Sequence, residues 1–220
     1  LYGKAYNDGN ATTNLGVPIV LTPTTSVTDA DYVSRATVEQ VYQQAIKDPT
    51  EAEAALPESN GFFATKSAAA GMLARLYLQM GNYSAAGNAA NRVINSGQFV
   101  LASNYLQAFP TVQEPGSPAQ PGANTREDVF AIQVTNLTGI NGFNEFYGSS
   151  TYGGRGDAVI SSTWIDANYT EDDERLESFY DDDDLFTAKF ANQYGNVSII
   201  RLAEMYLIRA ECNVRLAPAA

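Results

Sequence analysis

The chain has 220 residues, of which 45% are hydrophobic, so it is long enough to bury a core. Its 25 acidic and 13 basic residues give a formal net charge of −12, a field that repels nucleic acid and anionic membrane surfaces. It contains no histidine and one cysteine, which excludes histidine-dependent hydrolase sites, disulfide frameworks and ordinary zinc sites.

Residues 1–36 are rich in Gly, Pro, Thr and Asn, and predict an irregular crossing segment with turns. A helix is expected to begin at Thr37, because Thr37 and Gln40 have the spacing of a capping box. Asp48 and Pro49 repeat such a start signal, so this helix kinks or restarts there before it ends near Leu56.

Two further helices are expected in residues 37–97. Thr65 is a suitable N-cap for a helix that stops at Gly81, and Asn82 can cap another that stops at Gly97. The connection between these two helices is so short that they must form an antiparallel hairpin. The spacing of large, small and aromatic residues in this hairpin fits the tetratricopeptide (TPR) pattern. We expect burial at the helix contacts of Leu73, Leu76, Tyr77, Ala86 and Val93.

Residues 98–195 are predicted to be rich in loops, including an exposed loop at 113–125. The β-branched run at 128–134 predicts a strand or extended segment. Residues 196–217 are expected to form one helix of an incomplete hairpin, with Cys212 buried as a small hydrophobic residue. Its expected buried stripe is Ile199, Leu202, Ala203, Tyr206, Ala210 and Val214, and we expect part of the surface between Tyr206 and Leu216 to be bare. The predicted fold class is all-α, with TPR-like helix hairpins, long irregular loops and at most minor β structure.

The segment 136–164 concentrates aromatic rings among amides and charged groups. Such a mixture suits sugars, because a flat ring covers the C–H face of a pyranose while planar polar groups take its hydroxyls. The candidate ligand-binding residues are Phe143, Asn144, Phe146, Tyr147, Tyr152, Arg155, Asp157 and Trp164. The alternative is that these rings anchor a long loop to the helical body.

Two acidic runs, at 171–174 and 181–184, raise the question of calcium, which prefers several oxygen ligands. The spacing and the missing glycine do not fit an EF-hand loop. A solvated acidic surface is therefore predicted, with no metal site and no cofactor.

Several blocks of the sequence resemble the SusD/RagB family of outer-membrane nutrient-binding lipoproteins. These blocks are Leu1–Lys4 with Asn14–Val20, Arg35–Tyr42 closing at Ala55–Pro57, Ala64–Tyr83, and Ile200–Glu211. Their order and spacing are similar to the family along nearly the whole chain. The resemblance implies a partial domain over residues 1–220, truncated at both ends, because family members are about twice as long.

The resemblance also implies a function without catalysis. Such a protein binds glycans at the cell surface, as a lipoprotein of the outer membrane, and delivers them to a SusC-like TonB-dependent transporter. The membrane is contacted only through a lipid anchor that lies upstream of this chain. Because the matched motifs belong to the framework, they assign no binding residue.

Three other functions stay open at this stage. One is a RagB-like binder of peptides or other nutrients on the same scaffold. Another is a TPR-type scaffold for protein interactions. The third is a glycosidase with a pair of carboxylates, which needs no histidine.

Overall fold

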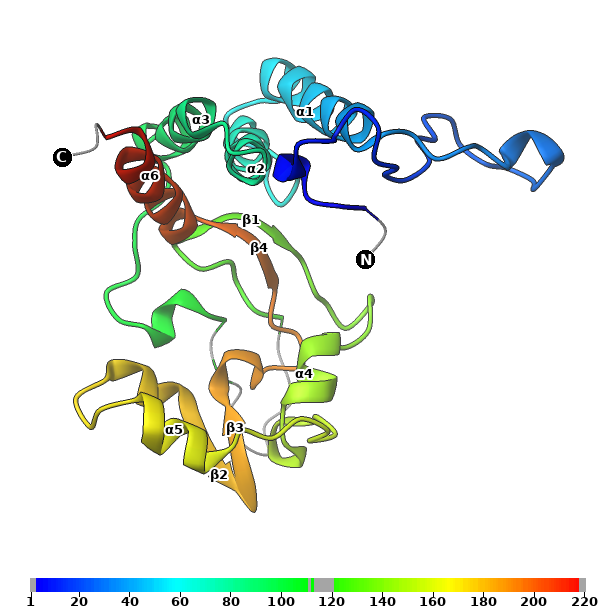
Figure 1. Ribbon diagram of the computed structural model, residues 1–220. Coiled ribbons are helices and arrows are strands. Elements are labelled where there is room, and N and C mark those ends of the chain that lie inside the picture. Colours follow the sequence, from blue (N-terminus) through cyan, green and yellow to red (C-terminus); the bar gives the residue numbers. More distant parts are fainter. Residues whose placement is uncertain (1–2, 111, 113–120, 218–220) are drawn as a thin grey trace. The chain divides into compact units, whose positions relative to one another are not determined.

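The computed structural model describes residues 3–110, 112 and 121–217 (Figure 1). The chain divides into two compact units. The first comprises residues 1–60, 64–95 and 205–220, and the second comprises residues 61–63 and 96–204. The predicted loop at 113–125 lies largely outside the described residues.

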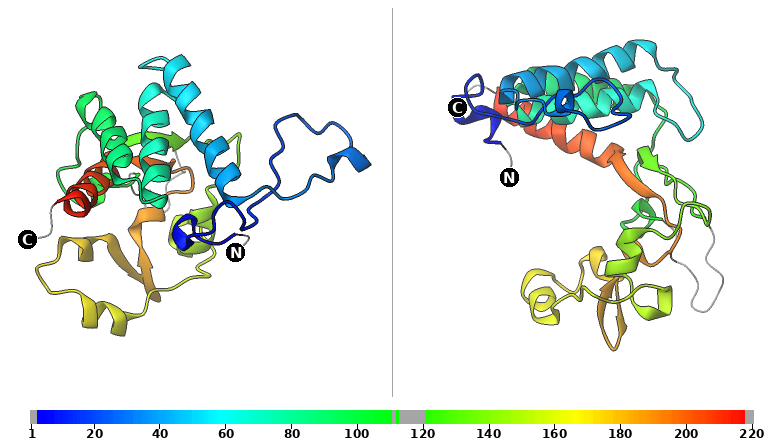
Figure 2. Two further views of the ribbon diagram at one scale, coloured as in Figure 1. Left: turned by 45° about the horizontal axis from the view of Figure 1, so that its top comes forward. Right: turned by 90° about the vertical axis from the view of Figure 1, so that its right-hand side faces the viewer.

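Three helices form the body of the first unit: α1 (Val38–Ala55), α2 (Lys66–Gln79) and α3 (Tyr83–Asn95). They lie side by side, with α2 between α1 and α3 (Figures 1 and 2). The capping box predicted at Thr37 is present, since its hydroxyl accepts from the Gln40 amide and the Gln40 side chain accepts in return. The helix α1 runs through Pro49 without a break, so three helices form and not four.

Helices α2 and α3 form the expected TPR-like hairpin. Gly81 turns the chain between them with φ = 71°, a backbone angle that favours glycine. The small side chains of Ala86, Ala89 and Ala90 are fully buried, so the two helix backbones approach closely. Burial is confirmed for Leu73, Ala86 and Val93, whereas Leu76 and Tyr77 are only half-buried.

The last helix, α6 (Leu202–Leu216), packs against α3 in the first unit. A Cβ atom built on Gly87 would lie 3.4 Å from Cβ of Cys212, so the two helices are close at this point. Cys212 is buried as predicted, and burial raises the pKa of its thiol.

The stripe predicted for α6 was wrong except at Leu202. The buried positions are Leu202, Met205, Ile208 and Cys212, while Ala210 and Val214 are exposed and Tyr206 is half-buried. Because α6 carries apolar residues on two faces, periodicity alone did not determine which face packs. Exposed apolar surface between Tyr206 and Leu216 is confirmed at Leu207, Val214 and Leu216.

Residues 3–37 contain only two short 3-10 helices, η1 (Tyr6–Asp8) and η2 (Asp29–Asp31). This agrees with the irregular segment that was predicted here. Arg35 joins the two ends of the loop between residues 16 and 35, because its guanidinium donates to the carbonyl oxygens of Gly16 at 2.7 Å and Leu15 at 2.9 Å.

Two small antiparallel sheets lie in the second unit. The predicted strand is confirmed as β1 (Asp128–Ile132), and it pairs with β4 (Val197–Arg201). Because residues 197–201 form β4, the helix predicted over residues 196–217 was wrong at its start, and α6 begins at Leu202. Strands β2 (Phe179–Asp182) and β3 (Asp184–Thr187) form a hairpin. The sheets are small additions, so the all-α class holds.

The side chain of Asn196 links β4 to two neighbouring segments of this unit. It is only 4% exposed, its amide nitrogen donates to Gly122 O, Asn124 Oδ1 and Gln133 Oε1, and its oxygen accepts from Val134 N. All these bonds measure 2.8–3.0 Å. A fully bonded buried amide of this kind fixes a loop-rich segment that has few helix contacts.

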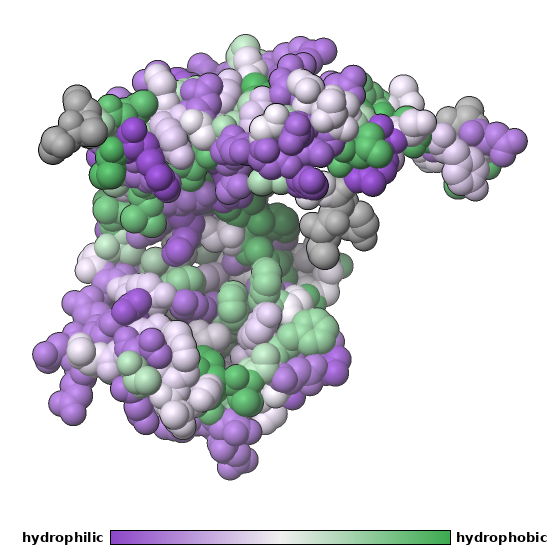
Figure 3. Space-filling view, in the orientation of Figure 1, coloured by the Kyte–Doolittle hydropathy of each residue, from purple (hydrophilic) through white to green (hydrophobic). Residues whose placement is uncertain are grey.

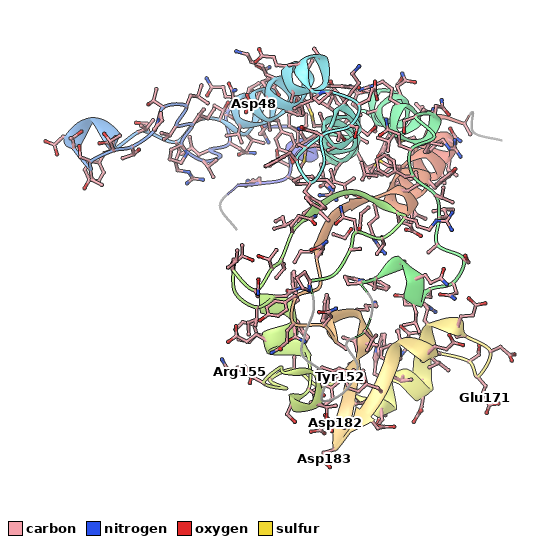
Figure 4. All side chains as sticks on the ribbon, turned by 180° about the vertical axis from the view of Figure 1, so that it is seen from behind. Asp48, Tyr152, Arg155, Glu171, Asp182 and Asp183 are labelled. Carbon is pink, nitrogen blue, oxygen red and sulfur yellow. The ribbon has the colours of Figure 1, made fainter. Side chains whose placement is uncertain are left out.

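The acidic run 181–184 forms the tip of the β2–β3 hairpin (Figure 4). This tip is hydrophilic surface in Figure 3. Over the described ranges, no three Asp, Glu, Cys or His side chains gather in a group that could hold a metal ion. Within the same ranges, every helix is too short or too polar to cross a membrane.

Candidate functional site

The predicted binding segment 136–164 forms two short helices in the second unit, α4 (Gly142–Tyr147) and α5 (Ser162–Asn168). Each begins at a side-chain cap. The Asn141 oxygen accepts from Phe143 N at 2.8 Å, and the Ser161 hydroxyl accepts from Trp164 N at 3.3 Å. The caps set the direction in which the rings of each helix project.

One of the predicted residues, Asn144, is fully buried. Its amide nitrogen donates to Phe190 O at 2.7 Å and to Tyr152 O at 3.2 Å. These bonds join α4 to two loops that are distant in sequence. The side chain of Asn144 therefore has a structural role and offers nothing to a ligand at the surface.

Three rings form a stacked group at α4. The ring of Phe143 lies 5.2 Å from that of Phe190 and 6.3 Å from that of Tyr147, measured between centroids. Tyr147 and Phe190 are 5.6 Å apart. Phe143 and Tyr147 are 44% and 42% exposed. This group offers a partly exposed aromatic surface of the kind predicted, and Phe190 belongs to it although the sequence analysis missed that residue.

Charged groups flank the same helix. The guanidinium of Arg155 lies 5.4 Å from the ring centroid of Phe146, and it forms ion pairs with Asp157 at 2.9 Å and Glu145 at 3.9 Å. Phe146 is 46% exposed, and Figure 4 shows Arg155 at the edge of the unit beside α4. The predicted pair Arg155 and Asp157 is thus brought together, next to a predicted ring.

Tyr152 belongs to a different group of rings. Its ring packs edge-on against Tyr180 at 4.9 Å, and the Tyr180 hydroxyl contacts Ser149 N at 3.1 Å. The hydroxyl of Ser149, followed by that of Thr151, lowers the pKa of the Asp182 carboxyl at the hairpin. This arrangement joins the loop after α4 to the hairpin, which agrees with an anchoring role for Tyr152.

Trp164 lies in a third group. Its ring packs edge-on against Tyr169 at 5.6 Å, and Arg175 lies 4.5 Å from the Tyr169 centroid. Hydrogen bonds from the Arg175 side chain and backbone hold the pKa of the Asp173 carboxyl at about 2. Trp164 is 52% exposed, so it offers an aromatic surface apart from the one at α4.

A pocket of about 240 Å³ opens beside the stacked group. Its volume is a little below the roughly 300–1,000 Å³ of small-molecule sites, which suits a group the size of one sugar ring. Three rings contribute to its walls, those of Phe109, Phe143 and Phe190. Two cations complete them. Lys189 Nζ and the guanidinium carbon of Arg201 each lie 5.0 Å from the Phe109 centroid.

Local structure places these groups. Lys189 and Phe190 lie in the 3-10 helix η6 (Ala188–Phe190), which is capped by the Thr187 hydroxyl. Arg201 ends β4 and donates from Nη1 to Ala108 O at 3.2 Å. Asn141 and Asn196 also line the pocket, but both are buried and their amides bond to the protein itself. They form a rigid polar floor.

Of the eight predicted residues, only Phe143 lines this pocket. The sequence analysis missed Phe109, Lys189, Phe190 and Arg201. The segment 189–196 combines rings, amides and a cation just as 136–164 does, so the same compositional argument could have found Lys189 and Phe190. No signal pointed to Phe109 or Arg201, since only the folded chain brings them to α4.

Comparison with known proteins relates the chain to one family. Residues 1–78 match the family model SusD-like_3, described as "Starch-binding associating with outer membrane". A SusD superfamily protein from Bacteroides thetaiotaomicron is 27% identical, with a TM-score of 0.70 over 98% of this chain and 50% of its own. The chain is thus similar to SusD superfamily proteins, both in its first 78 residues and in its fold. No curated protein matches it.

Two further SusD-like structures share the fold. A SusD superfamily protein from Bacteroides vulgatus is 22% identical, with a TM-score of 0.76 over 99% of this chain and 50% of its own. A SusD-like carbohydrate binding protein from the same species is 22% identical, with a TM-score of 0.67 over 95% of this chain and 46% of its own. The chain therefore spans about half the length of the solved structures it matches.

Proposed function

We propose that this chain is part of a protein that binds sugars without catalysis, and that the pocket beside α4 holds one sugar ring. The observation that carries this proposal is the convergence of Phe109, Phe143 and Phe190 with two cations around a small hollow. Aromatic faces cover the apolar side of a pyranose, and charged donors take its oxygen atoms. One of the similar structures is described as a carbohydrate binding protein, which agrees with this choice.

The remaining predicted residues extend the proposed surface. Tyr147 continues the stack from Phe143, and Phe146 with Arg155 and Asp157 forms its edge. A longer oligosaccharide would reach from the pocket onto these rings. Trp164, on α5, is proposed as a separate aromatic contact.

Calorimetric titration of the 220-residue chain with a panel of oligosaccharides tests the proposal. Phe143→Ala removes a partly exposed ring of the stack. We expect it to weaken the binding of any oligosaccharide that binds the parent chain by about three- to tenfold. Phe63→Ala is the matched control, because that ring is 77% exposed and lies outside the pocket. Equal affinities for these two variants would refute the placement of the site. Trp164→Ala, measured in the same way, reports whether the separate contact is used.

The alternative on the same scaffold is a RagB-like binder of peptides or other nutrients, and a TPR-type interaction scaffold is another. Titration with short peptides belongs in the same experiment. Binding of peptides, with no response to any sugar, would replace the proposed function by the first alternative.

We also propose the cellular setting that the family suggests. The full-length protein would be a surface-exposed lipoprotein of the outer membrane that delivers its ligand to a SusC-like TonB-dependent transporter. The description of the matching family, which names association with the outer membrane, supports the location. Protease treatment of intact cells and co-purification of the transporter with the full-length protein test the two parts separately.

A further inference from the structure

We propose that the pocket beside α4 selects a sugar that carries an anionic group, either the carboxylate of a uronate or a sulfate ester. This inference rests on the proposed function, since it assumes that the pocket receives a sugar. It adds the charge of the ligand, which the family and the aromatic walls leave open.

The charge of the pocket is opposite to that of the chain. The whole sequence carries 25 acidic and 13 basic residues, whereas the described residues that line the pocket include Lys189 and Arg201 and no acidic residue. A second hollow in the same unit is different. There Arg175 and Arg201 are accompanied by Glu127, Asp173 and Glu174. The pocket beside α4 therefore combines aromatic walls with two positive charges.

Across the described ranges of the chain, neither Lys189 nor Arg201 forms an ion pair. Other basic side chains do, among them Lys47, Lys66, Arg92, Arg155, Arg175 and Arg215. Within the same ranges, the Arg201 side chain donates one hydrogen bond, from Nη1 to Ala108 O, so Nε and Nη2 are available to a ligand. A planar guanidinium and an ammonium near each other suit the oxygen atoms of a carboxylate or sulfate.

Their mutual position favours an anion between them. Each charge lies 5.0 Å from the centroid of the same ring, that of Phe109, so the two are at most 10 Å apart. Screening at physiological salt acts over about 8 Å, and less effectively at a partly buried site, so the like charges repel. A ligand anion within reach of both would replace this repulsion with two attractions.

The pocket also holds an unused polar atom. The hydroxyl oxygen of Ser198, on β4, is buried and has no hydrogen-bond partner among the residues that the structure describes. Such a group gains when a ligand supplies the missing bond. Because Ser198 lines the same pocket as the two cations, it adds a neutral donor to the proposed anion site.

The experiment compares ligands that differ in charge alone. The 220-residue chain is titrated calorimetrically with oligogalacturonates, with their methyl esters, which are neutral, and with sulfated and unsulfated galactans. We expect the acidic member of at least one pair to bind about tenfold more tightly, and expect added salt to remove the difference. Comparison of the two pairs tells a carboxylate from a sulfate.

A variant ties the effect to the pocket. Lys189→Met keeps an unbranched side chain over the rings of Tyr105 and Phe109 but removes the charge, and should weaken acidic ligands about tenfold while leaving neutral ones unchanged. Lys47→Met is the control, because it removes the same charge from α1, where Lys47 pairs with Glu51 on the surface. Equal melting temperatures of the two variants exclude loss of fold as the cause.

The outcomes separate the two proposals. Tight binding of neutral sugars, with acidic ones no better, overturns the selection for an anion and leaves the proposed function intact. An acidic preference that Lys189→Met does not reduce overturns the assignment to this pocket. Absence of binding to every sugar overturns the proposed function and this inference with it.

Discussion

Replacement of Leu73 by alanine tests whether the hairpin of α2 and α3 forms the core of the first unit. Leu73 is 2% exposed and lies on α2, the helix that contacts both α1 and α3. The substitution removes about three methylene equivalents, which is roughly 2.4 kcal/mol of transfer free energy. The buried residues of this hairpin include many alanines, among them Ala74 and Ala90, whose short side chains cannot fill the space left behind.

The cavity adds to this cost, and we expect a total loss of about 3–4 kcal/mol in the free energy of unfolding. In a chain of this size, that corresponds to a fall in the melting temperature of about 6–15 °C. Urea titration followed by far-UV circular dichroism measures the loss, because most helical residues belong to the first unit. The loss should appear as a lower midpoint with an unchanged slope.

Leu207→Ala is the matched control. It makes the same chemical change on α6 at a side chain that is 71% exposed, so its effect should stay within about 0.5 kcal/mol. A loss below about 1 kcal/mol for Leu73→Ala, or equal losses for the two variants, would refute the assignment of the core to this hairpin.

Three further predictions concern the second unit. Asn196→Ala should lower the free energy of unfolding by about 1–3 kcal/mol, since it leaves the buried Val134 N–H without a partner and breaks the bonds to the segments at 122–124 and 133–134, and chemical denaturation measures this. Gly154→Ala should make the loop after α4 sensitive to proteolysis, because its Cβ would collide with a carbonyl oxygen of the preceding turn, whereas Gly142→Ala has open space and should stay resistant. Arg175→Met should return the pKa of Asp173 from about 2 towards its ordinary value of 3.8 in an NMR titration. In the parent chain this ion pair stabilises the fold above about pH 3.8, and its contribution is lost as the pH falls towards about 2; an unchanged pKa in the variant would contradict the pairing.

The sequence by itself determined the helices of the first unit, because their signals are local. Thr37 with Gln40, Thr65 and Asn82 cap helices where the spacing predicted, and Gly81 turns the chain between α2 and α3. Such signals act within four residues, so they can be recognised in the sequence without knowledge of the fold. The same locality explains why Pro49 misled, since burial of this residue inside the bundle outweighs its tendency to interrupt α1.

Only the tertiary structure decided the features that depend on distant partners. Ile199 and Ile200 follow a helical pattern, yet they form a strand because β1 offers its edge to them. The face that α6 buries was set by its packing, in which Cys212 lies against Gly87 of α3. Composition located a ring-rich segment and thus Phe143, but Phe109 and Arg201 reach the same pocket from other parts of the chain. Spacing along a sequence carries no information about such meetings, because they are fixed by packing between segments that the sequence separates by tens of residues.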